Sequence, residues 1–150
     1  MAMTREQLRS RLSAIEPEEG IYDQIGPDEI PLLEELLHDN EPWVASRAVF
    51  ALSTVSDARA VAILLRSSSD PRPEVRVALA ASLPNLNPED ANGILSILLD
   101  DSALGVRKFA IQSVSKVHNP AVRLKLQTLE TTDPEPAIRD FAKSKLRELR

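Results

Sequence analysis

Histidines and clustered carboxylates are the residues of this sequence whose chemistry could serve a catalytic or metal site. His38 and His118 each stand near the expected end of a helix, without the His-x-x-x-His spacing that a helical zinc site needs. The adjacent acids Glu34–Glu35 and Asp100–Asp101 could share acid–base work only if they converged, whereas neighbouring helical residues point apart. We interpret these acids as surface and turn residues.

Other catalytic signatures are missing from the sequence. It contains no cysteine, no glycine-rich phosphate loop, no Gly-x-Ser-x-Gly motif and no calcium-loop spacing. We therefore expect a protein that is not an enzyme, with no catalytic residue, no metal site and no cofactor. Function would then reside in a surface, and a repeat in the chain indicates which elements build it.

The repeat has a period of about 31 residues. Its anchor positions are Val44, Val75, Val106 and Ile138. An aspartate stands five positions before each anchor, and apolar residues recur four, eight and eleven positions after it. These offsets mark one stripe of an α-helix, so each copy predicts an amphipathic helix with a buried face. The residues at offset eleven are Val55, Leu86, Val117 and Leu149.

A second apolar helix precedes each copy. These helices are predicted around residues 30–37, 61–65, 94–99 and 122–129. Asp57, Asn87 and Asn119 can cap three of them, with Pro88 and Pro120 in the first turn, where a missing N–H costs nothing. Each repeat therefore reads as helix, tight turn, helix.

Helix pairs of this period form solenoids, because one pair cannot bury its apolar face alone and stacked pairs share a core. We predict an all-α fold, a right-handed α/α superhelix of about four helix pairs with an N-terminal helical cap. The chain forms one domain, 1–150, with the cap at 1–27 and repeats at 28–55, 58–86, 88–117 and 120–150. Thr4 and Gln7 make a capping box for a helix over 4–15, followed by a loop or short turn over 16–26.

The repeated string resembles HEAT repeats, especially the short bacterial kind. The matching segments are DPRPEVR at 70–76, DSALGVR at 101–107, DPEPAIR at 133–139 and, more weakly, DNEPWVA at 39–45. The resemblance spans roughly residues 28–150 and implies a curved rod whose second helices line the concave side. It also implies a ladder joining turn aspartates to the arginines six positions later, namely Asp70, Asp101 and Asp133 with Arg76, Arg107 and Arg139. Ala45 replaces the arginine in the first copy, so we expect the ladder to be broken there.

Three departures from the repeat carry further expectations. Pro84 should end the second helix of its repeat early, and an additional residue near Thr131–Thr132 should lengthen the last inter-helix turn. In the final copy Lys143 and Lys145 replace small or apolar residues, which indicates that no further repeat stacks on and that the array finishes at Arg150.

Charge is spread unevenly along the chain. The net charge is −5; residues 1–41 hold eleven acids and three bases, a balance of −8, whereas residues 42–150 hold twelve acids and fifteen bases, a balance of +3. The acidic end disfavours a nucleic acid running along the rod, which would need a sustained basic track. No apolar run reaches the length of a membrane span or forms a signal segment, so we expect a cytoplasmic monomer without a membrane partner.

The concave face should be built from the residues two, six and nine positions after each anchor. Its first two repeats present an apolar surface and its last two a polar, partly basic one, which suits a protein segment or helix. A modest basic strip on this face is formed by Lys108, Lys116, Lys143 and Arg147. Trp43 and Phe50 are the only aromatic residues expected near this strip, and they lie at the opposite end of the concave face. The candidate partner-binding residues are Trp43, Ser46, Phe50, Val77, Ala81, Lys108, Gln112 and Arg147.

Trp43 and Phe50 each have a second interpretation, burial beneath the N-terminal cap. The function that this pattern favours is a non-catalytic scaffold that binds a protein or peptide on its concave face. One alternative is a bilin-lyase-like or cofactor-chaperoning role, because short HEAT-like arrays that this one resembles occur in phycobilisome lyases. Another is nucleic-acid binding, which the acidic end makes the weakest of the three.

Overall fold

The computed structural model describes residues 3–13 and 21–150, and within these residues the chain forms nine α-helices and no β-strand. The α-helices are α1 (Arg5–Ser13), α2 (Ile30–Leu36), α3 (Pro42–Thr54), α4 (Ala58–Ser67), α5 (Pro73–Ser82), α6 (Pro88–Leu98), α7 (Leu104–Ser113), α8 (Pro120–Thr132) and α9 (Pro136–Glu148). Three short 3-10 helices, η1 (Ile21–Gln24), η2 (Pro27–Glu29) and η3 (Leu83–Asn85), join them. In the described part of the chain, no helix combines the length and apolarity needed to cross a bilayer.

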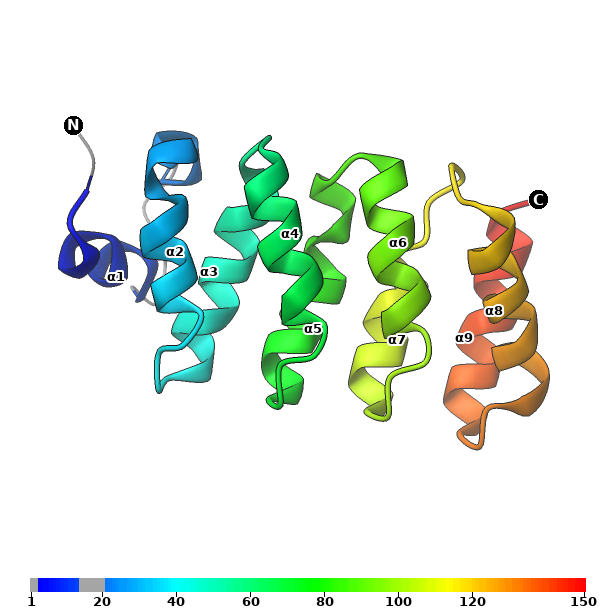
Figure 1. Ribbon diagram of the computed structural model, residues 1–150. Helices are drawn as coiled ribbons and strands as arrows, with labels where there is room; N and C mark the ends of the chain where they lie inside the picture. The colour runs from blue at the N-terminus through cyan, green and yellow to red at the C-terminus, as the bar shows by residue number, and fades with distance from the viewer. Residues whose placement is uncertain (1–2, 14–20) are drawn as a thin grey trace.

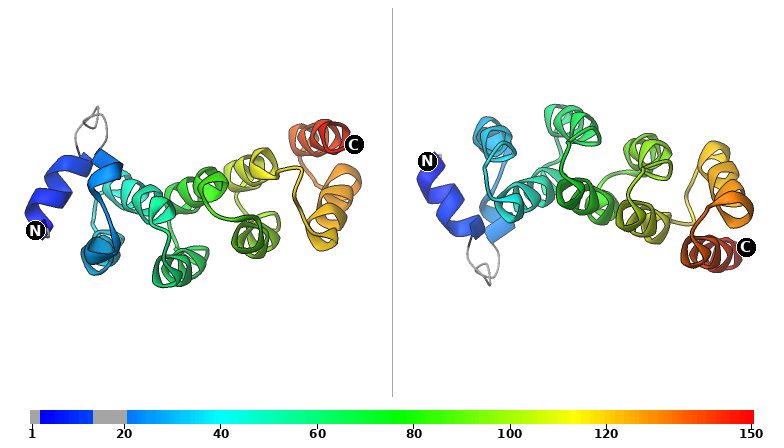
Figure 2. Two further views of the ribbon diagram at one scale, coloured as in Figure 1. Left: turned by 90° about the horizontal axis from the view of Figure 1, so that it is seen from above. Right: turned by 90° about the horizontal axis from the view of Figure 1, so that it is seen from below.

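The helices stand in two rows (Figures 1 and 2). We call α3, α5, α7 and α9 the odd-helix layer, in which each helix packs against the next, and α2, α4, α6 and α8 the even-helix layer. Helix α1 packs on α3 and α2 at the N-terminal end of the rows. The arrangement is an elongated stack of helix pairs, so the predicted all-α solenoid is confirmed.

The core follows the repeat. All four anchors, Val44, Val75, Val106 and Ile138, are 0% exposed. The residues four positions later, Ala48, Leu79, Ala110 and Ala142, are also fully buried. Burying one such Val, Leu or Ile side chain contributes roughly 1.5–3 kcal/mol. Because the anchors occupy equivalent places in consecutive pairs, one continuous apolar core runs the length of the stack.

Burial was predicted for the residues eleven positions after the anchors. This prediction is wrong for one copy and only partly met in two others. Val55 is buried, but Leu86 and Leu149 are half-buried and Val117 is 65% exposed. Helix α7 ends at Ser113, so Val117 belongs to the loop before α8 and no longer follows the helical stripe.

Capping is confirmed at each predicted start. The side chains of Asp57, Asn87 and Asn119 accept hydrogen bonds from backbone N–H groups two or three residues later, at 2.8–2.9 Å. Thr4 and Gln7 satisfy each other's backbone N–H groups at 3.0 and 3.1 Å, as a capping box does.

Two segment ends differ in how well they were predicted. Helix α5 ends at Ser82, just before Pro84, as expected. The predicted lengthening of the last turn is wrong, because Thr131 and Thr132 belong to α8 and only residues 133–135 separate α8 from α9. Both threonine hydroxyls donate to the Thr128 carbonyl oxygen one turn earlier, a contact that threonines within a helix commonly make.

The predicted first helix, 4–15, is present as α1 over Arg5–Ser13. Residues 14 and 15, and the first part of the predicted loop at 16–26, lie outside the described residues. The described remainder of that loop contains η1 and passes into η2, in which the buried Glu29 carboxylate accepts a hydrogen bond from the Gly26 N–H at 3.0 Å.

The ladder is present and has a more specific form than the resemblance implied. All three arginines donate to the backbone carbonyl of their own turn aspartate, and Arg76 and Arg107 also hold the carboxylate of the following repeat's aspartate. Arg76 donates to the Asp70 carbonyl at 2.7 Å and to both carboxylate oxygens of Asp101 at 2.8 and 3.1 Å. Arg107 repeats the pattern with the Asp101 carbonyl and the buried Asp133 carboxylate. The pairing with Asp101 raises the pKa of Arg76.

The ladder is broken at Ala45, as expected, and another arginine fills part of the gap. Arg72 holds the Asp70 carboxylate and donates to the carbonyl oxygens of Leu37 and Asp39 at 2.6 and 2.8 Å. Burial opposes ionisation of Asp70, but hydrogen bonds from the Arg72 side chain and N–H outweigh it and lower the pKa of this carboxyl.

Candidate partner-binding surface

The outward side of the odd-helix layer carries most of the predicted binding residues, and we call it the odd-helix face. Equivalent positions line up because equivalent helices lie side by side. Phe50, Ala81 and Gln112, six positions after their anchors, are exposed on consecutive helices. Ser46, Val77 and Lys108, two positions after the anchors, are half-buried. Six of the eight predicted residues therefore form two rows across α3, α5 and α7.

Trp43 and Phe50 supply aromatic area at the N-terminal end of the odd-helix face. Trp43 is 41% exposed in the first turn of α3, and the Arg47 guanidinium lies 5.2 Å from its ring centroid. Phe50 is 37% exposed and meets the Tyr22 ring edge-on, with centroids 4.7 Å apart. Tyr22 therefore covers one side of Phe50, while a large part of both aromatic side chains stays accessible.

Tyr22 is itself held in a partly apolar position. Burial raises the pKa of its phenol, and the charge of Arg47 acts in the opposite direction. The ring stays neutral at physiological pH and serves as a packing surface for Phe50.

The middle of the odd-helix face is formed where α5 meets its neighbours. The Ser46 hydroxyl donates to the Glu74 carbonyl oxygen at 3.4 Å, which joins α3 to α5. On the other side of α5, a Cβ at Gly105 would lie 3.7 Å from Val77 Cγ2, so the side chain of Val77 packs against the start of α7. Val77 therefore contributes both to this seam and to the accessible surface.

Lys108 lies between two aromatic rings that the repeat pattern did not predict near this surface. Its Nζ is 6.0 Å from the Phe109 centroid and 5.3 Å from that of Phe141 in α9. The expectation that Trp43 and Phe50 are the only nearby aromatics is therefore wrong. Phe109 and Phe141 stand three positions after their anchors, half-buried against the core, and this shared offset is the signal that could have identified them.

The residues nine positions after the anchors extend the face only in part, because Pro84 and Ser115 are exposed but Ser53 is not. Ser53 is 3% exposed and accepts a hydrogen bond from Asn85 at 3.0 Å while donating to the Phe50 carbonyl oxygen. Arg147 is exposed, but it lines a hollow with Arg123 between α8 and α9. The two rows at offsets two and six therefore form the main part of the odd-helix face.

The residues first considered for chemistry have other partners. Glu35 pairs with Arg5 and Glu34 with Arg66, each at 3.5 Å, and Asp100 pairs with Lys125. Within residues 3–13 and 21–150, no group of three or more His, Cys, Asp or Glu side chains could hold a metal ion.

The two histidines occupy different settings from each other. His38 is exposed in the turn after α2, near that helix's end as predicted. His118 lies in the loop before α8 rather than at a helix C-terminus, with Nδ1 2.9 Å from the Ser115 carbonyl oxygen and Nε2 3.3 Å from Arg123 Nη1. Its ring therefore ties that loop to α8.

Comparison with solved structures identifies the architecture, whereas no family model and no curated protein matches the sequence. A chain from the complex of CpcE and CpcF of phycocyanin lyase from Nostoc sp. PCC7120 superposes with a TM-score of 0.72 at 20% identity, covering 95% of this chain and 97% of that one. The fold is a HEAT/armadillo-like α-solenoid. Designed armadillo repeat proteins share this solenoid more distantly; one in complex with the peptide (KR)4 has a TM-score of 0.55 at 18% identity, covering 96% of this chain and 81% of that one. The HEAT-like resemblance of the repeats is thus confirmed at the level of the fold.

Proposed function

We propose that this protein is a non-catalytic interaction module that binds a segment of another protein across its odd-helix face. The observation that carries the proposal is the row of exposed Phe50, Ala81 and Gln112 on three consecutive helices, with Trp43 at one end. A segment lying across these helices would bury apolar side chains first and meet the cationic Lys108 next. Large aromatic side chains on a rigid surface are typical anchors of protein interfaces.

Comparison with the designed armadillo protein supports this use of the fold, because that protein was solved in complex with a peptide. The peptide there is (KR)4, whereas Lys108 on the odd-helix face of this chain would repel a basic peptide. We therefore expect an apolar segment with an acidic flank, its apolar part on α3 and α5 and its acids near Lys108.

The test is a selection of displayed peptides on the immobilised protein, followed by titration of the selected peptides against variants. Ala81→Asp places a charge in the middle of the face and should weaken binding by at least about tenfold, since charge burial on an apolar contact costs more than 1.4 kcal/mol. Ala62→Asp is the matched control, because Ala62 is also an exposed alanine, on α4 in the even-helix layer.

Thermal melting separates binding from folding in this experiment. Phe50→Ala should reduce affinity while leaving the melting temperature nearly unchanged, since Phe50 is not part of the buried core. If Ala62→Asp weakened binding as much as Ala81→Asp, or if Phe50→Ala lost folding and binding together, the odd-helix face would not be the binding surface.

A second candidate function rests on the phycocyanin-lyase complex, to which the similarity covers nearly the whole chain. In this second function the solenoid would bind a bilin chromophore, alone or together with a partner chain. Mixing the protein with a free bilin and recording the visible absorption spectrum tests it. A shifted and intensified absorption band would favour the bilin role. An unchanged spectrum would remove that role, and the binding of a protein segment would then be the remaining proposal.

A further inference from the structure

The last arginine of the ladder differs from the two before it. Arg139 donates through Nη1 to the Asp133 carbonyl oxygen at 2.6 Å, as Arg76 does to Asp70 and Arg107 to Asp101. Arg76 and Arg107 use the remaining edge of the guanidinium to hold an aspartate of the following repeat. Among the described residues, Arg139 has no such carboxylate partner.

The guanidinium of Arg139 is therefore held in place by a carbonyl while one edge stays open. A planar guanidinium presents parallel N–H groups that match the two oxygens of a carboxylate. Because its side chain is already oriented, binding a carboxylate there costs little additional conformational entropy.

Other cations share the same side of α9. Lys143 and Arg147 follow Arg139 at intervals of four residues, which places them on one face of α9, and Arg150 lies just beyond the end of that helix. Lys143 stands five positions after its anchor, where the earlier copies have Val49, Ala80 and Ile111. Those three side chains are buried at 0–1% exposure between repeats, whereas Lys143 is exposed. This side of α9 is thus the one that a following repeat would cover.

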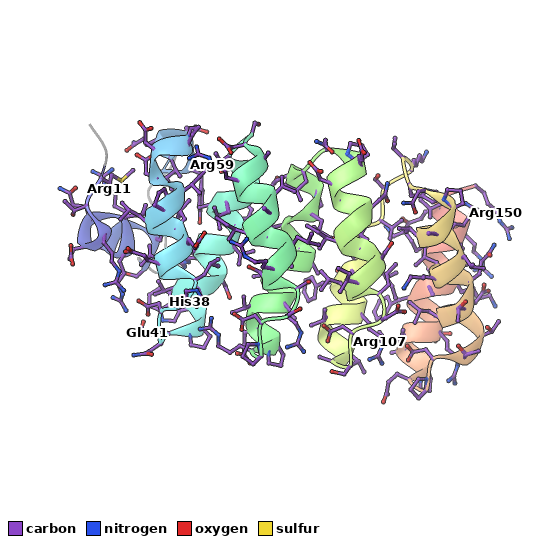
Figure 3. The ribbon with its side chains drawn as sticks, in the orientation of Figure 1. Arg11, His38, Glu41, Arg59, Arg107 and Arg150 are labelled. Carbon is purple, nitrogen blue, oxygen red and sulfur yellow. The ribbon has the colours of Figure 1, made fainter. Side chains whose placement is uncertain are left out.

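We call Arg123, Arg139, Lys143, Arg147 and Arg150 the terminal basic face. Figure 3 shows Arg150 at the opposite end of the stack from Arg11. A hollow of about 260 Å³ lies within the face, lined by Arg123, Gln127, Glu130, Lys143, Leu146, Arg147 and Arg150. Four cations and a single carboxylate thus surround it. Along α9, the row from Arg139 to Arg147 spans about 12 Å at 1.5 Å per residue.

Lys145 is not part of this face. It stands seven positions after its anchor and points back toward α7, where its Nζ donates to the Gln112 carbonyl oxygen at 3.1 Å. Lys143 and Lys145 both depart from the repeat pattern, but only Lys143 reaches the terminal side.

We propose that the terminal basic face binds an acidic segment of another protein, with an aspartate against the open edge of Arg139 and further carboxylates in the hollow. Carboxylates fit because this molecule already pairs the equivalent edges of Arg76 and Arg107 with aspartates. A nucleic acid fits less well, because phosphate binding needs a long basic track. The terminal basic face covers only one end of a chain whose net charge is −5. This surface is separate from the odd-helix face and goes beyond the proposed function.

The experiment measures fluorescence anisotropy of a labelled peptide of three Asp-Ala-Ala-Glu units with the full chain at low ionic strength. A matched peptide with Asn and Gln in place of the acids should not bind. Lys143→Glu should weaken binding of the acidic peptide by about tenfold, since the change replaces an attraction by a repulsion of similar size. Arg66→Glu, a charge reversal at an exposed arginine of α4 far along the stack, should alter it less than about twofold.

Arg139→Gln tests the open edge of Arg139, and Arg147→Glu provides a second, exposed position should Arg139→Gln fail to fold. Both should weaken binding, while Phe50→Ala should not, which separates this surface from the odd-helix face. No saturable binding of the acidic peptide, equal losses for Lys143→Glu and Arg66→Glu, or tighter binding of a single-stranded thymidine oligonucleotide of equal charge would overturn the proposal.

Discussion

Arg9 of α1 holds the carboxylate of Asp39 with Nε 2.7 Å from Oδ2 and Nη2 3.2 Å from Oδ1. The arrangement matches the ladder pairs, in which an arginine one position after a buried anchor donates hydrogen bonds to the carboxylate of the next repeat's aspartate. Leu8 and Leu12, at 0% exposure, stand where an anchor and its offset-four residue would be. Helix α1 therefore packs as the second helix of a repeat, and Arg9 extends the ladder to the N-terminal end.

Arg9→Ala should lower the free energy of unfolding, because it leaves a nearly buried carboxylate without its charged hydrogen-bond partner. Urea unfolding followed by circular dichroism measures the change. Arg5→Ala is the control, since the Arg5–Glu35 pair is largely exposed and should contribute less than about 1 kcal/mol. Equal effects of the two substitutions would mean that α1 is not anchored through Asp39.

Arg107→Ala should destabilise the fold more strongly than alanine substitution of any other ladder arginine. The Asp133 side chain is 3% exposed, so removing Arg107 leaves a buried charge unpaired at a cost of about 3–5 kcal/mol. Arg139→Ala removes the equivalent arginine without stranding a carboxylate and should cost only about 1 kcal/mol. Chemical denaturation of both variants checks the difference; similar losses would indicate that the carbonyl contacts, not the ion pairs, stabilise the ladder.

Acid should weaken the N-terminal half of the stack through Asp39 and Asp70. Hydrogen bonds from Arg9 lower the pKa of Asp39, and those from Arg72 lower the pKa of Asp70 against the effect of burial. A carboxyl whose pKa is lowered by folding stabilises the protein fully above its unfolded pKa, near about 4, and loses that contribution as pH falls through its folded value. The free energy of unfolding should therefore decrease below about pH 4.

Asp39→Asn tests the source of this pH dependence. The variant should be less stable at neutral pH and should show a shallower loss of stability on acidification, because one of the two linked carboxyls is gone. Urea midpoints measured between neutral pH and about pH 3 record both effects. An unchanged slope would show that the Arg9–Asp39 pair does not contribute to the acid sensitivity.

The repeating parts of the fold were predictable because periodic burial leaves a periodic pattern. Val44, Val75 and Val106 are equivalent in the sequence and equivalent in the core. Irregular segments were not, since a count of offsets assumes a continuous helix: Val117 falls beyond the end of α7, and Thr132 extends α8 where a turn was expected.

The candidate surface was predictable only in part for a related reason. Helical offsets place Phe50 and Ala81 outward correctly, but they do not record the contacts between neighbouring repeats. Those contacts bury Ser53 against Asn85 and bring Phe141 beneath Lys108. The role of Arg9 was hidden because Leu8 precedes Val44 by 36 positions rather than about 31, so the register of the repeat is lost before α2.

Gly93→Ala should stabilise the protein, and it tests whether the even-helix layer faces open solvent at α6. Gly93 is exposed in the interior of α6, and a Cβ placed there would have no heavy atom within 4 Å. Alanine restricts the unfolded chain and favours the helix, so the free energy of unfolding should rise by roughly 0.5–1 kcal/mol. Gly105→Ala serves as the comparison: its Cβ would meet Val77 Cγ2 at 3.7 Å, in the first turn of α7, and its gain should be smaller. A loss of stability in Gly93→Ala would mean that another surface packs against this position.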